Sequence, residues 1–170
     1  MKKGGTGGRK TSETGLKFER DTSLEEALMA ADFRVENFKV YEPTGGLIAE
    51  LAPKFQLYKF LEARNIAWQE RLSKRLLPDE AIYSFGGHRL SIIEKKWQEV
   101  EGSVDEKLQT VGFKIRQYNR LVDGTGMEIK FIYLLNDWFS KPGYADVLDY
   151  IKECGADYHF LSVPLEELEL

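Results

Sequence analysis

Two strands joined by a tight turn are predicted for Leu77–Gln98, whose sequence is LPDEAIYSFGGHRLSIIEKKWQ. Its two arms are rich in apolar and β-branched residues, and the Gly86-Gly87 pair between them is typical of a β-hairpin. Pairing the arms about this turn places Asp79 opposite Glu94. Two carboxylates are therefore expected side by side at the open end of one hairpin.

A cation has to lie near such a pair, because like charges on neighbouring strands repel each other. Lys96 follows Glu94 by two residues, so the alternation of a strand places both side chains on one face, whereas Lys95 points to the other face. Magnesium binds a few protein carboxylates together with water and phosphate oxygens. The sequence therefore predicts an all-oxygen site for Mg²⁺, with Mn²⁺ as a substitute, in which Asp79, Glu94 and Lys96 surround one point.

These residues resemble the motif of the PD-(D/E)xK nuclease superfamily, which is best known from type II restriction endonucleases. Pro78-Asp79 is followed by fourteen residues and then by Glu94-Lys95-Lys96. The resemblance implies a restriction endonuclease-like core in which Asp79, Glu94 and the main-chain carbonyl of Lys95 bind Mg²⁺. It also implies that Lys96 is the catalytic lysine of a phosphodiester hydrolase.

Two other acid-x-lysine motifs and one histidine compete with this assignment. Asp105-Glu106-Lys107 lies on an expected helix, where the acid and the lysine do not share a face. Glu128-Ile129-Lys130 begins a strand downstream of Asp123 and is the alternative metal site. His88 is an alternative general base, although the hairpin turn directs it away from the paired acids. A further alternative is that residues 78–96 form a surface hairpin with a solvated, charged end.

The charge of the chain is distributed unevenly, although its net value of −4 argues weakly against a nucleic-acid partner. Residues 64–120 carry eleven Lys and Arg against eight Asp and Glu, whereas residues 121–170 carry three against ten. A DNA-binding surface is a local property of a protein. The basic region around the hairpin is therefore compatible with DNA.

Positive and polar residues after the hairpin are the candidates for DNA contacts. Ser103 forms a capping box with Glu106, so the helix that begins there presents free N–H groups suited to a phosphate. The cationic stretch that follows contains arginine and amide side chains, which read base edges in the major groove. The predicted DNA-binding residues are Gln98, Ser103, Lys107, Lys114, Arg116, Gln117, Asn119 and Arg120.

The chain is expected to form an α/β (α+β) fold in which helices flank a mixed central β-sheet. Residues 1–11 are expected to be a flexible basic tail, and residues 12–170 a single domain. The strand over 127–135 should be parallel to the strand that ends at Lys96, because a helix connects them. Glu19, on the first helix, is a further metal ligand suggested by the resemblance. Helices are expected from Ser12 through Glu19 and over 24–31, 53–66, 103–121 and 146–154, and further strands over 33–41 and 158–163.

We therefore expect a Mg²⁺-dependent endonuclease that cuts double-stranded DNA at specific sites, in the manner of type II restriction enzymes. Cutting both strands takes two active sites, so a homodimer is expected. A homing endonuclease of a phage or an intron, a junction resolvase, and a non-catalytic DNA-binding or interaction domain are the alternatives. One cysteine and no long apolar run predict no disulfide framework, no membrane partner, and a cytoplasmic location in a bacterial or phage-infected cell.

Overall fold

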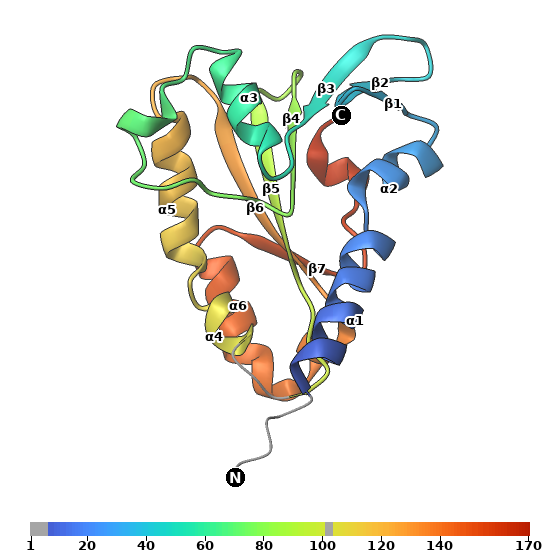
Figure 1. Cartoon of the computed structure of the whole chain (residues 1–170), viewed down its shortest axis with the longest axis vertical. Helices are drawn as coiled ribbons and strands as arrows, with labels where there is room; N and C mark the ends of the chain where they lie inside the picture. Colours follow the sequence, from blue (N-terminus) through green and yellow to red (C-terminus); the bar gives the residue numbers. More distant parts are fainter. Residues whose placement is uncertain (1–6, 101–103) are drawn as a thin grey trace.

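The chain folds around one mixed β-sheet with helices on both faces (Figure 1). The computed structural model describes residues 7–100 and 104–170. In these residues seven strands lie in the order β1-β2-β3-β4-β5-β6-β7, which is also their order in the sequence. The predicted class, a mixed sheet flanked by helices, is thus confirmed.

The bounds of the elements are as follows. The strands are β1 (Arg34–Glu36), β2 (Lys39–Tyr41), β3 (Leu47–Leu51), β4 (Glu80–Ser84), β5 (Arg89–Lys96), β6 (Glu128–Leu135) and β7 (Asp157–Phe160). The helices are α1 (Gly7–Asp21), α2 (Leu24–Ala30), α3 (Gln56–Glu62), α4 (Val104–Leu108), α5 (Val111–Val122) and α6 (Ala145–Glu153). Short 3-10 helices are η1 (Trp68–Glu70), η2 (Asp137–Ser140), η3 (Pro142–Tyr144) and η4 (Leu165–Leu168).

The β4–β5 hairpin has the register expected from its sequence. Glu80 pairs with Ile93 and Ser84 with Arg89 in an antiparallel ladder. Continuing this register by one residue places Asp79 opposite Glu94, as predicted. The turn is longer than the predicted two residues, because Phe85 and His88 also lie outside the strands.

The second half of the sheet is parallel. Strand β6 pairs in parallel with β5, with Glu94 beside Tyr133, and β7 pairs in parallel with β6. Helix α5 makes the crossover between β5 and β6, which confirms the predicted parallel pairing. The inner strand β6 is buried over its last five residues, as its continuous apolar sequence predicts.

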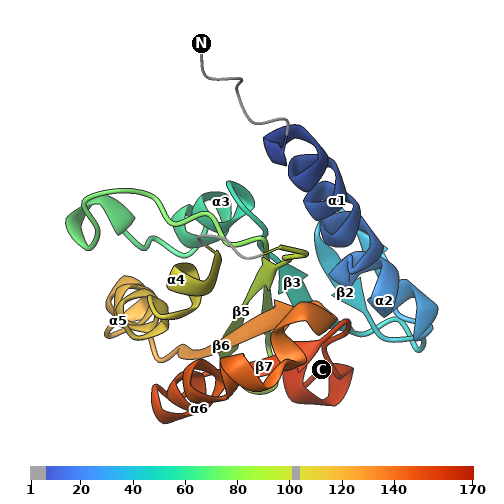
Figure 2. The same cartoon turned by 90° about the horizontal axis from the view of Figure 1, so that it is seen from below.

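Two separate cores lie on the two faces of the sheet. Figures 1 and 2 show α5 and α6 on one side of the strands and α1 and α2 on the other side. The first core includes Ile92 and Tyr133, and the second includes Ile93 and Ile132. Successive residues of β5 and β6 therefore face different cores, so the two faces of β5 can carry different groups of charged residues.

The N-terminal part of the sheet differs from the prediction. The single strand expected over 33–41 is a hairpin of β1 and β2, because Asn37 and Phe38 adopt the left-handed backbone conformation with φ of 51° and 65°. Two such residues in succession form a tight hairpin turn. The alternating pattern continues across this turn, which made two strands look like one. Strand β3 was not predicted.

Three further boundaries also differ. The helix expected over 103–121 is interrupted after α4, where the Thr110 hydroxyl donates to the Lys107 carbonyl at 2.7 Å and so competes with helical hydrogen bonding. Helix α1 begins at Gly7, ahead of the predicted Ser12. Strand β7 ends at Phe160, because Leu161 is left-handed with φ of 65°. Among the described residues, no helix combines the length and apolar character needed to cross a membrane.

Candidate active site

The paired acids lie at the open end of the β4–β5 hairpin. Asp79 immediately precedes β4, and Glu94 and Lys96 are among the last residues of β5. The carboxylate Oδ2 of Asp79 accepts a hydrogen bond from the main-chain N–H of Lys95 at 2.8 Å. This bond directs the Asp79 side chain toward the end of β5, where Glu94 also lies.

Three oxygen atoms converge on the ammonium group of Lys96. Its Nζ lies 2.9 Å from Glu94 Oε2, 2.9 Å from the Lys95 carbonyl oxygen and 3.7 Å from Asp79 Oδ2. The resemblance to the nuclease superfamily assigns these same residues as metal ligands. The side chains of Asp79, Glu94 and Lys96 are 23%, 12% and 13% exposed, so the group is sheltered but reachable from solvent.

A second lysine contacts the same acid. Lys114, on α5, places its Nζ 2.7 Å from Glu94 Oε2. Lys114 was predicted to contact DNA, whereas in the structure it points inward to Glu94. Its spacing contains the missed signal, because Val111 and Tyr118 lie three residues before and four residues after it, and both are buried.

The charges around Glu94 determine its protonation. Burial raises the pKa of Glu94, but the ammonium groups of Lys96 and Lys114 lower it more, so the pKa is below its ordinary value. Burial raises the pKa of Tyr118 and Tyr133, and the negative charge of Glu94 raises it further. Near neutral pH, Glu94 is therefore a carboxylate and both phenols keep their protons.

The side chain of Lys95 lies on the opposite face, as predicted. It is 3% exposed, and its Nζ contacts Glu80 Oε1 at 2.9 Å and the main-chain carbonyl of Glu19 at 2.8 Å. The same Glu80 oxygen accepts from the main-chain N–H of Leu24 at 3.5 Å. Lys95 therefore connects β5 to the end of α1, while its main chain contacts Asp79 and Lys96 on the other face.

Glu19 lies near the acids without joining them. It lines a hollow of about 320 Å³ together with Asp79, Glu80 and Lys95. Its carboxylate Oε2 lies 3.8 Å from Lys54 Nζ. The structure thus brings Glu19 to the same hollow as Asp79, on the side of the hairpin where Lys95 is buried.

The donor set at Lys96 fits a hard divalent cation. Within residues 7–100 and 104–170, no group of three or more His, Cys, Asp and Glu side chains is arranged to hold a metal. The site offers two carboxylates and one main-chain carbonyl, and Mg²⁺ and Mn²⁺ accept a few such protein oxygens with water and phosphate oxygens as the remaining ligands. No nitrogen or sulfur ligand suited to Zn²⁺ belongs to the set.

One predicted DNA contact is buried. Gln98 is 3% exposed; its main-chain N–H donates to Asn136 Oδ1 at 3.1 Å and its carbonyl accepts from Asn136 Nδ2 at 2.9 Å. Gln98 therefore joins the ends of β5 and β6, a position that does not favour contact with DNA.

The other predicted DNA contacts lie at or near the surface, apart from Lys114. Ser103 lies outside the described residues, and Gln117 is half-buried. The exposed residues of this group are Lys107, Arg116, Asn119 and Arg120.

The residues of the alternative sites have other partners. Glu128 Oε2 lies 3.2 Å from Arg89 Nη2. Lys130 Nζ lies 3.4 Å from Asp157 Oδ2 and 2.8 Å from Glu167 Oε2. The main-chain carbonyl of Asp123 accepts a hydrogen bond from Arg71 Nη1 at 2.6 Å. Among the described residues, no contact joins the Asp123 carboxylate to Lys130.

His88 lies in the turn, at the opposite end of the hairpin from Asp79. Its Nδ1 is 3.0 Å from the Tyr83 hydroxyl. This position agrees with the prediction that His88 is directed away from the acids.

The specific residues of the likeness to the PD-(D/E)xK superfamily lie within 78–108. The geometry at this end of the hairpin brings together Asp79, Glu94 and Lys96, with the main chain of Lys95. Function therefore has to be inferred from the site itself, because comparisons with protein-family models, curated proteins and solved structures find no match to this chain.

Proposed function

We propose that this protein is a Mg²⁺-dependent DNA endonuclease with a restriction endonuclease-like core. The observation that supports the proposal is the convergence of Asp79, Glu94 and the Lys95 carbonyl on one cationic group. One acid just before β4 and one near the end of β5, together with a main-chain carbonyl, form an all-oxygen donor set. Such a donor set suits a divalent cation that must also bind phosphate oxygens.

The residues have separate tasks in this proposal. Asp79, Glu94 and the Lys95 carbonyl would hold Mg²⁺ or Mn²⁺ in the place of the Lys96 ammonium. The ion supplies Lewis acidity, which polarises the scissile phosphate and acidifies a water molecule. Lys96, released from the acids, donates to the phosphate or orients the attacking water. Lys114 keeps Glu94 ionised through its contact at 2.7 Å.

The chemistry is hydrolysis of a phosphodiester. The oxygen of water forms a bond to phosphorus and the water releases one proton to solvent, while the bond from phosphorus to the leaving sugar oxygen breaks and the leaving oxygen takes up one proton from solvent. Negative charge accumulates on the phosphoryl oxygens during this step. Fixed positive charges next to these oxygens stabilise the transition state, and Lys96 and Lys114 are the two candidates on this face.

A restriction-type enzyme that cuts double-stranded DNA as a homodimer is the first candidate. A homing endonuclease or a junction resolvase would use the same residues for the same reaction. A DNA-binding domain without activity would keep the acids as a solvated pair neutralised by Lys96 and Lys114. Cleavage separates the last possibility from the others.

The test is incubation of supercoiled plasmid with the protein in EDTA and then with single ions restored. We expect no cleavage in EDTA, cleavage with Mg²⁺ or Mn²⁺, and binding without cleavage with Ca²⁺, which is larger and acidifies its water less. Discrete fragments would indicate restriction, and nicking would indicate another nuclease. Full activity in EDTA, or activity with Zn²⁺ but not Mg²⁺, would contradict the proposed ligands. Intact plasmid under all conditions would leave the non-catalytic alternative.

A further inference from the structure

A second hollow lies outside the acid cluster, between η1 and α5. Its volume is about 440 Å³. One wall is the segment 69–73, and the other wall is α5, which contributes Phe113, Arg116, Gln117 and Arg120. We call this hollow the α5 groove.

The α5 groove carries unneutralised positive charge. Arg116 and Arg120 lie one helical turn apart and are exposed, and neither side chain forms an ion pair or a hydrogen bond with any residue that the structure describes. Glu70, in the opposite wall, is the one carboxylate among the lining residues. Arg71, in the opposite wall, is fixed by hydrogen bonds to the carbonyls of Leu121 at 3.0 Å and Asp123 at 2.6 Å. Two free guanidinium groups in a groove indicate an anionic ligand.

An aromatic ring lies beside these arginines. Phe113 precedes Arg116 by three residues, so the two share a face of α5. Its side chain is 63% exposed, although the helix buries other apolar residues such as Val111 and Leu121. An exposed aromatic ring flanked by arginines is the combination that binds single-stranded nucleic acids, in which the ring stacks on a base and the cations contact the backbone.

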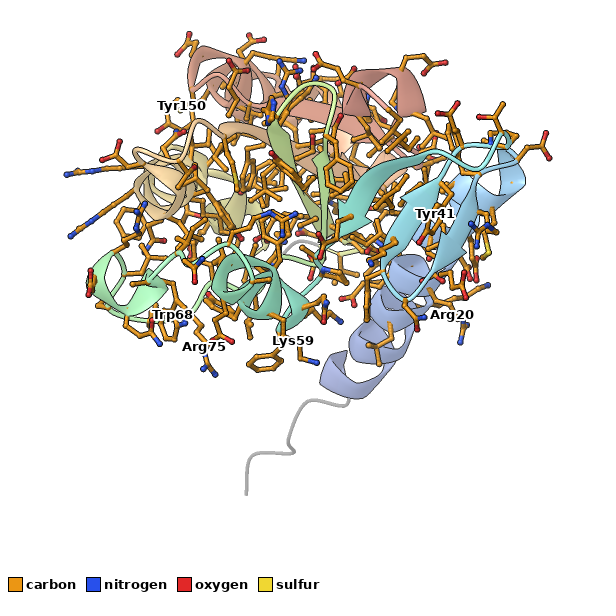
Figure 3. All side chains as sticks on the ribbon, turned by 90° about the horizontal axis from the view of Figure 1, so that it is seen from above. Arg20, Tyr41, Lys59, Trp68, Arg75 and Tyr150 are labelled. Atoms are coloured by element: carbon orange, nitrogen blue, oxygen red, sulfur yellow. The ribbon has the colours of Figure 1, made fainter. Side chains whose placement is uncertain are left out.

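The wall opposite α5 is held in place by packing. The Trp68 ring of η1 lies edge-on against Tyr58, with the ring centroids 4.9 Å apart. The guanidinium of Arg75 stacks over Trp68 at 4.9 Å, and Figure 3 shows both residues at the same end of the molecule. The groove is therefore bounded by two fixed elements.

These walls favour a single strand over a duplex as the occupant of the groove. A helix that reads the major groove must protrude, because the groove is about 12 Å wide. Helix α5 is flanked by the segment 69–73 on one side. On another side it packs against α6, where a Cβ at Gly112 would lie 3.3 Å from Cys154 Sγ and 3.4 Å from the Tyr150 hydroxyl. A single strand can place a base against the Phe113 ring, whereas the bases of a duplex are already stacked on one another and present no free face.

Both walls of the α5 groove lead to the acid cluster. Lys114 follows Phe113 on α5 and contacts Glu94. The segment after Ser73 continues to Asp79, and Figure 1 shows it passing from beside α5 to the start of β4. The groove and the acid cluster are therefore connected through α5 and through the segment 74–78.

We propose that the α5 groove binds a single-stranded DNA segment adjacent to the cleaved phosphodiester. This inference rests on the proposed nuclease function for the position of the cut. It narrows the substrate to DNA that contains an unpaired end, a flap or a branch beside the duplex. Phe113 stacks on a base of the unpaired segment, and Arg116 and Arg120 contact its phosphates.

The test measures binding in EDTA by fluorescence anisotropy, with a labelled single-stranded oligonucleotide and the blunt duplex of the same sequence. We expect Phe113→Ala to weaken single-strand binding about five- to hundredfold, because one stacked base is lost. Phe113→Trp should preserve binding and Phe113→Leu should not. Phe38→Ala, which alters another exposed phenylalanine, is the matched control. Removing both Arg116 and Arg120 should lower the salt slope by about 0.7 for each lost contact.

The outcomes distinguish this inference from the nuclease proposal. Single-strand binding that is unchanged in the Phe113 and arginine variants overturns the groove, whether or not plasmid is cut. Displacement of the oligonucleotide by polyglutamate, with Phe113→Ala binding as wild type, would indicate an acidic protein as the partner and would also overturn it. Groove-dependent binding without cleavage in Mg²⁺ supports the groove and contradicts the nuclease function. With active protein, a flapped duplex should be cut faster than the blunt duplex, and Phe113→Ala should remove this preference.

Discussion

Lys96 and Lys130 lie on neighbouring strands and have partners of the same kind. Each faces two carboxylates within 4 Å, and their side chains are 13% and 21% exposed. The origin of the acids differs. The acids at Lys96 come from the two strands of one hairpin and leave the lysine in contact with a main-chain carbonyl as well. The acids at Lys130 are Asp157 of β7 and Glu167 of η4.

The acids at Lys130 also have second partners. Asp157 lies 2.6 Å from Lys152, and Glu167 lies 2.9 Å from His159. This cluster fastens β7 and the C-terminal segment to the sheet. The Lys96 cluster is centred on residues that are already adjacent in a hairpin, with Lys114 of α5 as a further partner of Glu94. The two clusters have similar side chains, but the origin of their acids differs. From this difference we expect a structural role for Lys130 and a catalytic role for Lys96.

The largest effect is expected from the acids at Lys96. Asp79→Asn and Glu94→Gln should each reduce plasmid cleavage by about a thousandfold, because a metal ion contributes several kcal/mol to the transition state. DNA binding in EDTA should be retained or improved, since negative charge is removed. The matched control is Glu167→Gln, which should cut at the wild-type rate. Cleavage above a tenth of the wild-type rate in either of the two variants would count against the assignment.

A direct exchange of roles between the two lysines is the next test. Lys96→Ala should lower the cleavage rate by about 10²–10³-fold, as expected for loss of one group that stabilises negative charge in the transition state. Lys130→Ala should cut normally but melt a few degrees lower, because a partly exposed ion pair contributes about 1 kcal/mol or less. A folded but inactive Lys130 variant beside an active Lys96 variant would move the site to Asp123 and Glu128.

The smallest effect concerns pH, and here the two clusters should behave alike. Burial raises the pKa of Glu167, but Lys130 and His159 lower it more, as Lys96 and Lys114 do for Glu94. A carboxyl whose pKa is lower in the folded state adds stability above its unfolded pKa, about 4.3, and this stability is lost as the pH falls through the folded value. Melting temperatures measured between pH 6 and pH 3 should therefore fall less steeply in Glu94→Gln and in Glu167→Gln than in the wild type. An unchanged slope in both variants would show that neither carboxylate is paired in solution.

The local parts of the fold were predictable from the sequence. The Gly86-Gly87 turn and the alternation of a strand determine the hairpin register, so the approach of Asp79 to Glu94 and the opposite directions of Lys95 and Lys96 follow from local rules. The parallel pairing of β6 follows from the helix between the strands.

Other features depend on contacts between distant segments. The spacing of Lys114 from Val111 and Tyr118 indicates that it faces inward, but its contact with Glu94 joins α5 to β5 across 20 residues. Gln98 is buried by Asn136, a residue 38 positions later in the chain. The α5 groove needs the segment 69–73 as its second wall. These contacts join segments that are far apart in the sequence, so the burial of Gln98 and the second wall of the α5 groove could not be predicted from the sequence alone.

Lys95 has a consequence for how this sequence can vary in evolution. Its N–H holds Asp79, its carbonyl contacts Lys96, and its ammonium holds Glu80 and the end of α1. A substitution there disturbs both faces of the sheet at once, although the side chain never faces the acid cluster. In a library that samples all twenty amino acids at each position, tolerance at Lys95 should be nearly as narrow as at Asp79. Among homologous chains, the residue types at positions 95 and 80 should covary.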